Sequence, residues 1–315
     1  MKIVFIEPLG MSENQVMQQC QSLKNAGHQI VFHDNRNEDE QTLIERAKDA
    51  EIIVISNIPL HKNFFEHCPN LRMVSVAFTG VDHIDLAACK ERGITVCNAA
   101  GYSTQAVAEL AIGMMIAVYR KIAGGDTITR IGDDRQNFLG SELHGKTVGI
   151  VGTGAIGQRV ALLAHAFGCR VIGYNRSGKP AEYVELTDKE TLLKSADIIS
   201  LHIPLTADTR NFIQDEEFGL MQPHAVLINT ARGPIVSQDA LYKALKKGKI
   251  AGAALAVYDQ EPPLPTNLEL FNAPNLLMLP YMGYATKEAF GIRLGVVVKN
   301  VEMWLAGTPQ NLIRL

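Results

Sequence analysis

Three glycines, spaced Gly152-x-Gly154-x-x-Gly157, are the residues whose types and spacing point most directly to chemistry. They end an apolar run at residues 147–152 and lead into a helical pattern at residues 158–167. In such a motif the first glycine allows a tight turn, the second lets backbone approach a phosphate, and the third lets the helix pack close to the strand. The helix N-terminus offers free N–H groups and partial positive charge to an anion. The motif therefore predicts a dinucleotide-binding site.

The end of the next expected strand, at residues 170–175, indicates which dinucleotide binds. An NAD site usually carries Asp or Glu there to bind the ribose 2′-hydroxyl, whereas this chain has Asn175 followed by Arg176, Ser177 and Lys179. An acid would repel a 2′-phosphate, but an amide, a hydroxyl and two cations suit one. A solvated turn with incidental charges is the alternative interpretation. We predict that NADP is the preferred cofactor and NAD the second choice.

Composition excludes several classes of protein. The 315 residues suffice for two domains, and 47% apolar with 20% charged residues is typical of soluble globular proteins. A net charge of −3 gives no basic surface for nucleic acid, and the short apolar runs predict no membrane span. The first residues resemble a strand rather than a signal peptide. The five cysteines are widely spaced, so we expect reduced thiols, no metal site and a cytoplasmic location.

The elements that must position these residues alternate between strand and helix. In the first hundred residues, strands are expected at 2–7, 29–34, 51–56, 72–77 and 95–98. Ser12-x-x-Gln15 has the pattern of a capping box that opens the first helix. The βα alternation predicts a parallel sheet, without a glycine phosphate loop after its first strand.

A second alternating series begins near residue 146. Before it lie a long helix, expected at residues 104–121, and a polar, glycine-rich stretch at residues 124–145. Thr187-x-x-Glu190 is expected to cap one helix of the series. The expected strands match a complete dinucleotide-binding sheet and lie at 147–152, 170–175, 197–203, 224–230, 252–257 and 275–280.

The last segment, residues 286–306, is expected to form one amphipathic helix. It has no sheet of its own, so we expect it to return to the first domain and make that domain discontinuous. The patterns predict an α/β protein with two doubly wound parallel sheets: a substrate domain of residues 1–100 and 285–315, and a dinucleotide-binding domain of residues 101–284. We expect the active cleft between the sheets, where ligands collect at strand C-termini.

Several segments together carry a family resemblance. Besides the glycine motif they are Phe78-Thr-Gly-Val-Asp-His-Ile-Asp85, Asn98-Ala-Ala-Gly-Tyr-Ser-Thr104, Leu201-His-Ile-Pro-Leu-Thr206, Asn229-Thr-Ala-Arg-Gly233 and Glu261-Pro262. In these segments the chain resembles the D-isomer-specific 2-hydroxyacid dehydrogenases, the family of phosphoglycerate, glycerate and D-lactate dehydrogenases. The resemblance implies a Rossmann domain inserted into a flavodoxin-like substrate domain, a nicotinamide cofactor, a small carboxylate substrate and a homodimer.

The resemblance also implies roles for particular residues. Arg232 is similar to the arginine that binds the substrate carboxylate and polarises its carbonyl, a task that suits a planar, two-pronged donor; a surface arginine in a turn is the alternative. The N–H groups of the loop Thr79-Gly80-Val81 are expected to hold the carboxylate, with a plain turn as the alternative. Phe78 and Tyr102 are expected to line the site, with core packing as the alternative role of Tyr102. His202 is expected to be structural rather than catalytic. The expected cofactor contacts are Gly152, Gly154, Ala155, Ile156, Gly157, Asn175, Arg176, Ser177, His202, Ile203, Pro204, Thr209, Thr230, Ala231 and Arg232.

The chain departs from the family pattern at the proton-relay position. Glu261 matches the catalytic carboxylate, which in the family pairs with a histidine and keeps that proton donor charged near neutral pH. The histidine slot reads Leu279-Pro280-Tyr281-Met282-Gly283, so a tyrosine stands where the histidine is expected. The family's aspartate that helps hold the nicotinamide amide is here Ala256. A phenol has an ordinary pKa of about 10 and a histidine about 6.5, so a His–Glu relay cannot be assumed.

Three interpretations of the acid–base site follow. Tyr281 is the acid of a reductase, or water, His83 or Tyr284 supplies the proton, or the chain binds NADP(H) without turnover, as a regulatory or scaffold protein. An altered substrate that needs no side-chain acid is a further interpretation. We predict an oxidoreductase that passes hydride between NADP(H) and C2 of a small 2-oxo or 2-hydroxy carboxylate, with Arg232, Glu261 and Tyr281 as catalytic residues. The regulatory protein is the alternative.

Overall fold

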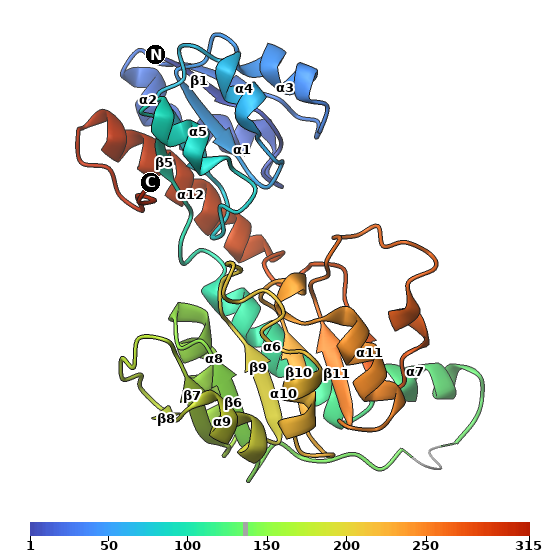
Figure 1. The fold of residues 1–315 in the computed structure, drawn as a ribbon. Coiled ribbons are helices and arrows are strands. Elements are labelled where there is room, and N and C mark those ends of the chain that lie inside the picture. The colour runs from blue at the N-terminus through green and yellow to red at the C-terminus, as the bar shows by residue number, and fades with distance from the viewer. Residues whose placement is uncertain (135–137) are drawn as a thin grey trace. The chain divides into compact units, whose positions relative to one another are not determined.

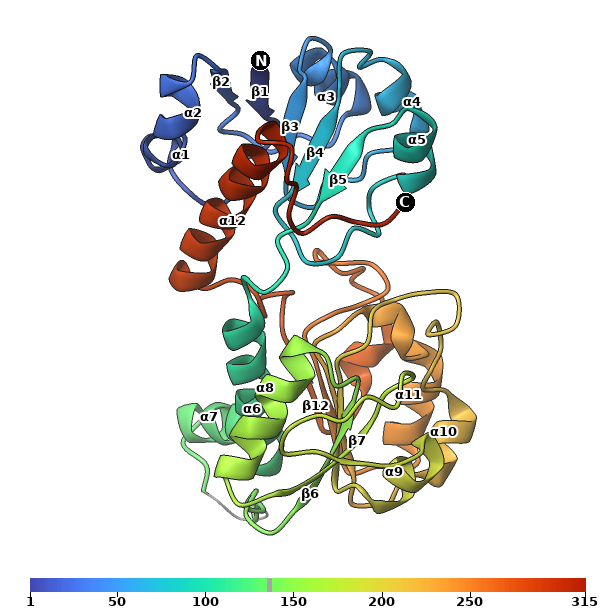
Figure 2. The same ribbon diagram turned by 90° about the vertical axis from the view of Figure 1, so that its left-hand side faces the viewer.

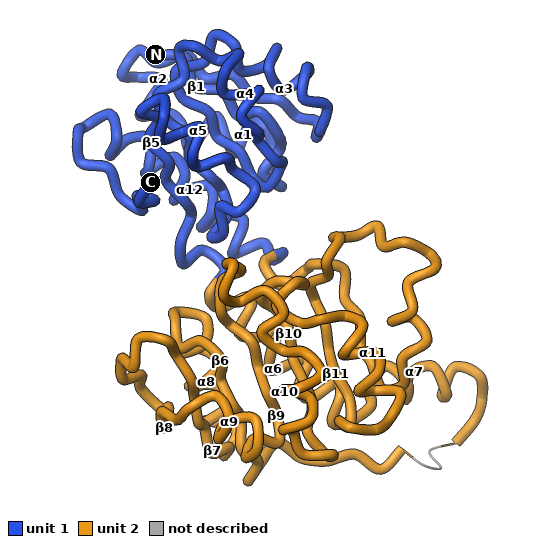
Figure 3. Tube along the Cα trace, in the orientation of Figure 1, with its two compact units in different colours: residues 1–103, 285–315 blue, residues 104–284 orange. Residues whose placement is uncertain are grey.

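The chain folds into two compact units. The computed structural model describes residues 1–134 and 138–315. Unit 1 comprises residues 1–103 and 285–315, and unit 2 comprises residues 104–284 (Figure 3). Each unit has its own parallel sheet, which confirms the predicted α/β fold class.

Unit 1 is built on a five-stranded parallel sheet with the strand order β2-β1-β3-β4-β5, the flavodoxin-like order. Helices cover both faces, so the central strands are buried throughout, as parallel sheets require. Figure 2 shows α1, α2 and α12 on one side of this sheet and α3, α4 and α5 on the other. The strands are β1 (Lys2–Phe5), β2 (Gln29–Phe32), β3 (Ile52–Ile55), β4 (Met73–Val76) and β5 (Thr95–Cys97); the helices are α1 (Glu13–Gln19), α2 (Gln21–Asn25), α3 (Glu40–Ala47), α4 (Lys62–Glu66), α5 (Leu86–Glu91) and α12 (Lys287–Leu305).

Helix ends in unit 1 follow the local sequence. The predicted capping box is confirmed, because the Ser12 hydroxyl accepts from the Gln15 N–H while the Gln15 side chain accepts from the Ser12 N–H. Helix α12, from the far end of the chain, packs against β4 and α1. There Ser75 of β4 donates a hydrogen bond to the carbonyl of Val297 at 3.1 Å.

Unit 2 has a seven-stranded parallel sheet with the order β12-β11-β10-β9-β6-β7-β8. The chain reverses its direction across the sheet between β6 and β9, which is the switch point of a doubly wound fold. One apolar core lies under α6 and α8, and a second lies under α9, α10 and α11 on the opposite face (Figure 1). The strands are β6 (Thr147–Val151), β7 (Arg170–Tyr174), β8 (Glu185–Leu186), β9 (Ile198–Leu201), β10 (Val226–Asn229), β11 (Gly252–Leu255) and β12 (Leu276–Met278); the helices are α6 (Thr104–Tyr119), α7 (Ile122–Arg130), α8 (Ala155–Ala166), α9 (Lys189–Ser195), α10 (Asp215–Leu220) and α11 (Gln238–Lys246).

One local prediction for unit 2 is wrong. Helix α9 is capped by Asp188, whose carboxylate accepts from the Thr191 N–H at 2.8 Å, and the cap therefore lies one residue after the expected cap at Thr187. Aspartate is at least as good an N-cap as threonine, so Asp188 takes the cap position from the neighbouring Thr187. Helix α7 overlaps the polar, glycine-rich stretch of residues 124–145. Two glycines weaken its helical signal, while an Arg130–Asp126 ion pair at 2.8 Å supports it.

All five cysteines are free and buried, as expected for reduced thiols, and burial raises the pKa of Cys20 to about 12. Within residues 1–134 and 138–315, no helix is long and apolar enough to cross a membrane. The same residues contain no group of three or more His, Cys, Asp or Glu arranged to hold a metal ion.

Candidate active site

The three glycines of the motif differ in the space available beside them. Gly152 has a φ of 96°, and a Cβ there would lie 2.7 Å from the carbonyl oxygen of His202. A Cβ on Gly157 would lie 2.0 Å from the carbonyl oxygen of Gly152, so helix and turn are in direct backbone contact. A Cβ on Gly154, by contrast, meets nothing within 4 Å. The fold itself thus needs Gly152 and Gly157, while open space lies beside Gly154, as expected where a phosphate approaches.

The N-terminus of α8 is suited to bind an anion. Gly154 is its N-cap, so no side chain occupies the first free N–H groups, and the first turn contains no acidic residue. Gly154 and Ala155 are exposed. The partial positive charge of the helix is therefore left for a ligand.

The different constraints predict different effects of two alanine substitutions. Gly157→Ala should lower the free energy of unfolding by about 1–3 kcal/mol, the usual cost of overpacking. Gly154→Ala should leave stability nearly unchanged but weaken NADPH binding about tenfold, or about 1.4 kcal/mol, because the methyl group enters the phosphate space. Urea denaturation without cofactor and fluorescence titration with NADPH measure the two effects. Equal stability of the two variants would contradict this assignment.

The predicted 2′-phosphate segment forms a turn that Asn175 holds together. Its amide donates to Thr153 Oγ1 at 2.7 Å and to the Lys179 carbonyl at 2.9 Å, and its oxygen accepts from the Ser177 hydroxyl at 3.0 Å. Arg176 is 87% exposed, and its Nη1 lies 3.6 Å from Oδ2 of Asp208, which is 80% exposed. Exposed ion pairs of this kind contribute little to the free energy of unfolding. Asn175 therefore shapes the turn, and the Arg176 guanidinium stays available to a ligand.

The loop that follows β9 lies beside the glycine motif. His202 Nε2 is 2.9 Å from the Ser200 hydroxyl, and burial lowers the pKa of His202 to about 4, so this ring is neutral. A neutral, fixed ring suits the expected structural role. Farther along, the Thr209 hydroxyl donates to the Pro204 carbonyl at 2.6 Å and accepts from the Thr206 N–H at 2.7 Å. Thr209 thus closes the turn that carries Ile203 and Pro204.

The turn after β10 positions Arg232. Asn229, almost fully buried, donates to the Arg232 carbonyl at 2.9 Å and accepts from the Ala231 N–H at 3.0 Å. A Cβ on Gly233 would lie 1.9 Å from the Tyr258 carbonyl carbon, so the backbones of these two segments touch. The Arg232 Nη1 donates to the Ala231 carbonyl at 2.8 Å. Within the described residues, the buried Thr230 hydroxyl has no protein partner, which fits a ligand contact here.

Glu261 is the residue with the most unusual electrostatics in this region. Its Oε1 accepts a long bond from the Tyr258 N–H, at 3.4 Å, and its buried Oε2 has no hydrogen-bond partner in the described part of the chain. Burial raises the pKa of Glu261 to about 7, although the Tyr258 N–H and the charge of Arg232 act to lower it. The carboxyl group therefore gains or loses its proton near neutral pH.

Tyr281 occupies the slot of the expected histidine in an unusual backbone conformation. Its φ is 44°, the left-handed region that non-glycine residues rarely adopt. Its ring meets Tyr284 edge-on, with the centroids 5.6 Å apart. The Leu279 carbonyl accepts a hydrogen bond from the Tyr281 N–H at 3.0 Å and a second one from the buried Tyr258 hydroxyl. Backbone strain of this kind is typical of functional turns.

In unit 1, the expected carboxylate loop presents free N–H groups. In the described structure, the N–H groups of Thr79, Gly80 and Val81 donate to no protein acceptor. Asn98 fixes the loop by donating to the Thr79 carbonyl at 2.7 Å. Phe78 and Tyr102 are buried, with ring centroids 6.2 Å apart, so they support the loop. That they contact substrate stays a prediction.

Comparison with known proteins places the chain in a family. The family model for the NAD-binding domain of D-isomer specific 2-hydroxyacid dehydrogenases matches residues 112–283, more than half of the chain. The chain belongs to this family. It is 41% identical over 288 residues to a glyoxylate reductase of Thermococcus litoralis, covering 86% of each protein.

Two solved structures are similar along almost the whole chain. An acyclic imino acid reductase, Bsp5, in complex with NADPH and D-Arg, is 34% identical, with a TM-score of 0.90 and coverage of 100% of both chains. A D-2-hydroxyisocaproate dehydrogenase is 28% identical, with a TM-score of 0.84 and coverage of 99% of both chains. The protein is therefore an oxidoreductase that binds a nicotinamide dinucleotide, as the glycine motif predicted.

Sequence reasoning missed the residues that place the catalytic groups. Asn229 and Gly233 fix the turn that carries Arg232, and Tyr258 anchors the segments that carry Glu261 and Tyr281. An amide at the last position of a strand was the available signal for Asn229, because such residues often shape the turn that follows. The close backbone contact at Gly233 involves a segment 25 residues away and has no local signal.

Proposed function

We propose that the protein is an NADP(H)-dependent reductase that acts on C2 of a small 2-oxo carboxylate, with Glu261 as proton donor. The observation that carries the proposal is the buried Glu261 carboxyl beside the charge of Arg232, with its pKa raised to about 7. A general acid works best when its pKa is close to the working pH. Glu261 thereby takes over the task that the family assigns to a histidine.

Each group of the chain has a separate task in this mechanism. The cofactor, when bound, supplies the hydride. Arg232 and the N–H groups of Thr79–Val81 bind the substrate carboxylate, and Arg232 polarises the carbonyl. Protonated Glu261 gives its proton to the forming alkoxide. The Tyr281 phenol offers a second hydrogen-bond donor to the substrate.

A 2-imino acid is the second candidate substrate. Tyr281 in the histidine slot favours it, because a protonated imine already carries the proton that a carbonyl must receive from an acid. Hydride transfer to the C=NH₂⁺ carbon then gives the neutral amine directly, and an ionised Glu261 would stabilise the cation before transfer. The similar Bsp5 protein, an acyclic imino acid reductase, supports this candidate.

NADPH consumption separates the candidates. A series of 2-oxo acids is offered with and without ammonium, and NADPH absorbance is followed. Consumption without ammonium supports the 2-oxo acid, whereas consumption that depends on ammonium supports the imine. Tight NADPH binding with no consumption in either arm would contradict both and favour a regulatory protein.

The charge of Arg176 should set the cofactor preference. Arg176→Ala should weaken NADPH binding about 10- to 150-fold, because a charged hydrogen bond contributes about 1.5–3 kcal/mol, and should change NADH binding much less. Asp208→Ala, the matched control, removes the competing carboxylate and should tighten NADPH binding slightly. Titration of each variant with both cofactors measures this, and equal losses for NADPH and NADH would refute the assignment.

A further inference from the structure

Arg293, in helix α12 of unit 1, is a charged residue in an apolar setting. Only 3% of it is exposed, and it lies on the face of α12 that also buries Leu294, Val297 and Val301. Burying a guanidinium is costly unless its N–H groups find acceptors in good positions. The contacts of the Arg293 guanidinium therefore indicate the role of this buried charge.

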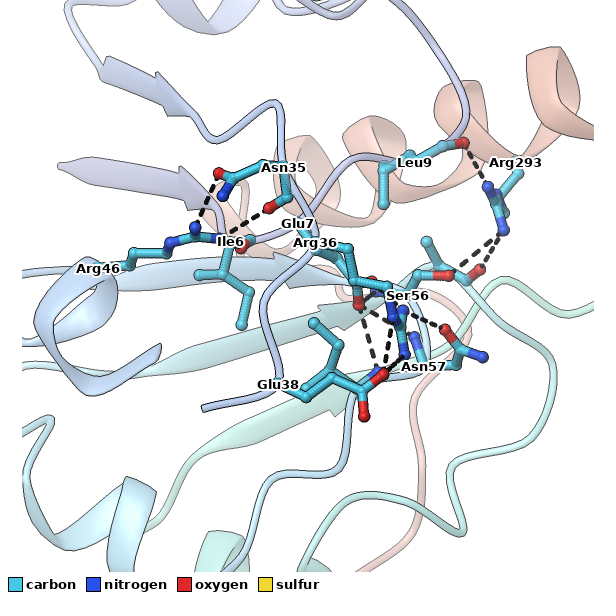
Figure 4. Close-up of polar contacts among 12 residues, drawn as sticks. Ile6, Glu7, Leu9, Asn35, Arg36, Glu38, Arg46, Ser56, Asn57 and Arg293 are labelled. Atoms are coloured by element: carbon cyan, nitrogen blue, oxygen red, sulfur yellow. Dashed lines mark hydrogen bonds and ion pairs between the residues drawn. The ribbon is translucent and has the colours of Figure 1, made fainter. Parts of the chain in front are cut away.

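The guanidinium of Arg293 joins the ends of three adjacent strands (Figure 4). It donates to the carbonyl of Leu9, which follows β1, to the Ser56 hydroxyl after β3 at 3.4 Å, and to the carbonyl of Ala77 after β4 at 3.5 Å. All three acceptors lie at the carboxyl edge of the sheet, because the strands are parallel. Ala77 directly precedes the loop Phe78–Val81.

Arg293 also supports the aromatic residues beneath that loop. Its Cζ lies 4.5 Å from the ring centroid of Phe290 and 5.7 Å from that of Tyr102. Tyr102 in turn packs on Phe78, the first residue of the loop. One side chain thus fixes the loop both through the backbone before it and through the ring at its start.

A second polar contact strengthens the same edge of the sheet. The N–H of Ser56 donates to Glu7 Oε1 at 2.7 Å, and Glu7 Oε2 accepts from Arg36 at 2.6 Å. Ser56 therefore links Arg293 to an ion pair whose carboxylate partner, Glu7, is buried while Arg36 is partly exposed (Figure 4). The Arg293 side chain is anchored in a network rather than in a single contact.

We propose that Arg293 is the positioning residue of the substrate-carboxylate loop. This inference rests on the proposed function, in which the N–H groups of Thr79–Val81 bind the carboxylate. Arg293 does not touch the substrate. It holds the Ala77 carbonyl and the Phe78–Tyr102 pair, so that the free N–H groups keep one orientation before substrate arrives.

The test compares Arg293→Met with Arg293→Lys. The methionine variant keeps volume but loses the hydrogen bonds to Leu9, Ser56 and Ala77, and it should raise KM for the 2-oxo acid about tenfold while kcat changes less. Lysine keeps the charge but has no planar fork, so its KM should lie between those of wild type and Arg293→Met. The Kd of NADPH should stay within about twofold of wild type in both variants, because the glycine motif belongs to unit 2.

Val301→Ala is the matched control. Val301 is buried in the same helix, and its truncation should lower stability without changing KM. Binding of oxamate, an unreactive 2-oxo acid analogue, to the NADPH complex reports on the loop without turnover. Wild type that binds oxamate but consumes no NADPH refutes the proposed function alone. The inference is overturned by any of three results. Arg293→Met binds oxamate as tightly as wild type, Val301→Ala weakens oxamate binding as much as Arg293→Met does, or wild type shows no detectable oxamate binding.

Discussion

Replacement of Arg232 by alanine is expected to lower kcat/KM for the 2-oxo acid by about 30- to 5,000-fold, corresponding to about 2–5 kcal/mol. The variant loses the two-pronged contact with the carboxylate and the charge that polarises the carbonyl. Steady-state kinetics under saturating NADPH measure the loss. The effect should fall on both kcat and KM, because Arg232 acts on ground state and transition state.

The same variant should change the pH dependence. The Arg232 charge lowers the pKa of Glu261, so its removal should raise that pKa further and move the pH profile of kcat upward. Arg232→Lys should restore part of the pH profile but little of the rate, since an ammonium lacks the planar fork. Arg170→Ala is the matched control, because Arg170 forms an exposed ion pair with Glu185. A loss of less than about threefold in Arg232→Ala, or the same loss in Arg170→Ala, would remove Arg232 from the mechanism.

The sequence predicts those parts of the site that rest on local patterns. Gly152 and Gly157 are needed because a strand, a turn and a helix follow one another directly in the chain. The sequence likewise predicts that Arg232 lies in the turn after a strand, because the apolar residues of β10 precede it. Local prediction failed where two neighbouring residues compete, as Thr187 and Asp188 do for the N-cap of α9.

Properties that depend on distant segments could not be predicted. The pKa of Glu261 depends on how deeply the turn after β11 is buried, which no spacing in the sequence reveals. Arg293 looks in the sequence like an ordinary polar residue of an amphipathic helix. Its acceptors lie more than 200 residues away along the chain, at Leu9, Ser56 and Ala77, and only the folded sheet brings them to it.

The largest change in the proton step is expected from Glu261→Gln. Glutamine keeps the shape of the side chain but cannot release a proton, so reduction should slow by about 10²- to 10⁴-fold, the usual contribution of a general acid. In wild type, the rate of hydride transfer should fall as pH rises through about 7, because only protonated Glu261 is the acid. In the variant this dependence should disappear. Single-turnover rates between about pH 5 and about pH 9 measure both effects.

The raised pKa also predicts a pH dependence of stability. The folded protein binds the Glu261 proton more tightly than the unfolded chain, whose pKa is near the ordinary value of 4.5. The tighter proton binding adds to the free energy of unfolding in full below about pH 4.5, and this addition is lost as pH rises through about 7. The loss is about 1–3 kcal/mol of the free energy of unfolding when solvent screening is allowed for. Glu261→Gln should therefore be more stable than wild type at about pH 8 and lose that advantage at about pH 4.

Tyr281→Phe separates the two acid candidates. If Glu261 is the donor, removal of the phenol hydroxyl should cost less than about tenfold in the reduction rate, the value of one hydrogen bond, and should leave the pH profile in place. If Tyr281 is the donor, Tyr281→Phe should slow reduction by about 10²- to 10⁴-fold. The rate of hydride transfer in wild type should then not depend on pH near 7. If neither variant slows hydride transfer while the compound offered is an imine, the substrate brings its own proton, and Glu261 serves only to stabilise its charge.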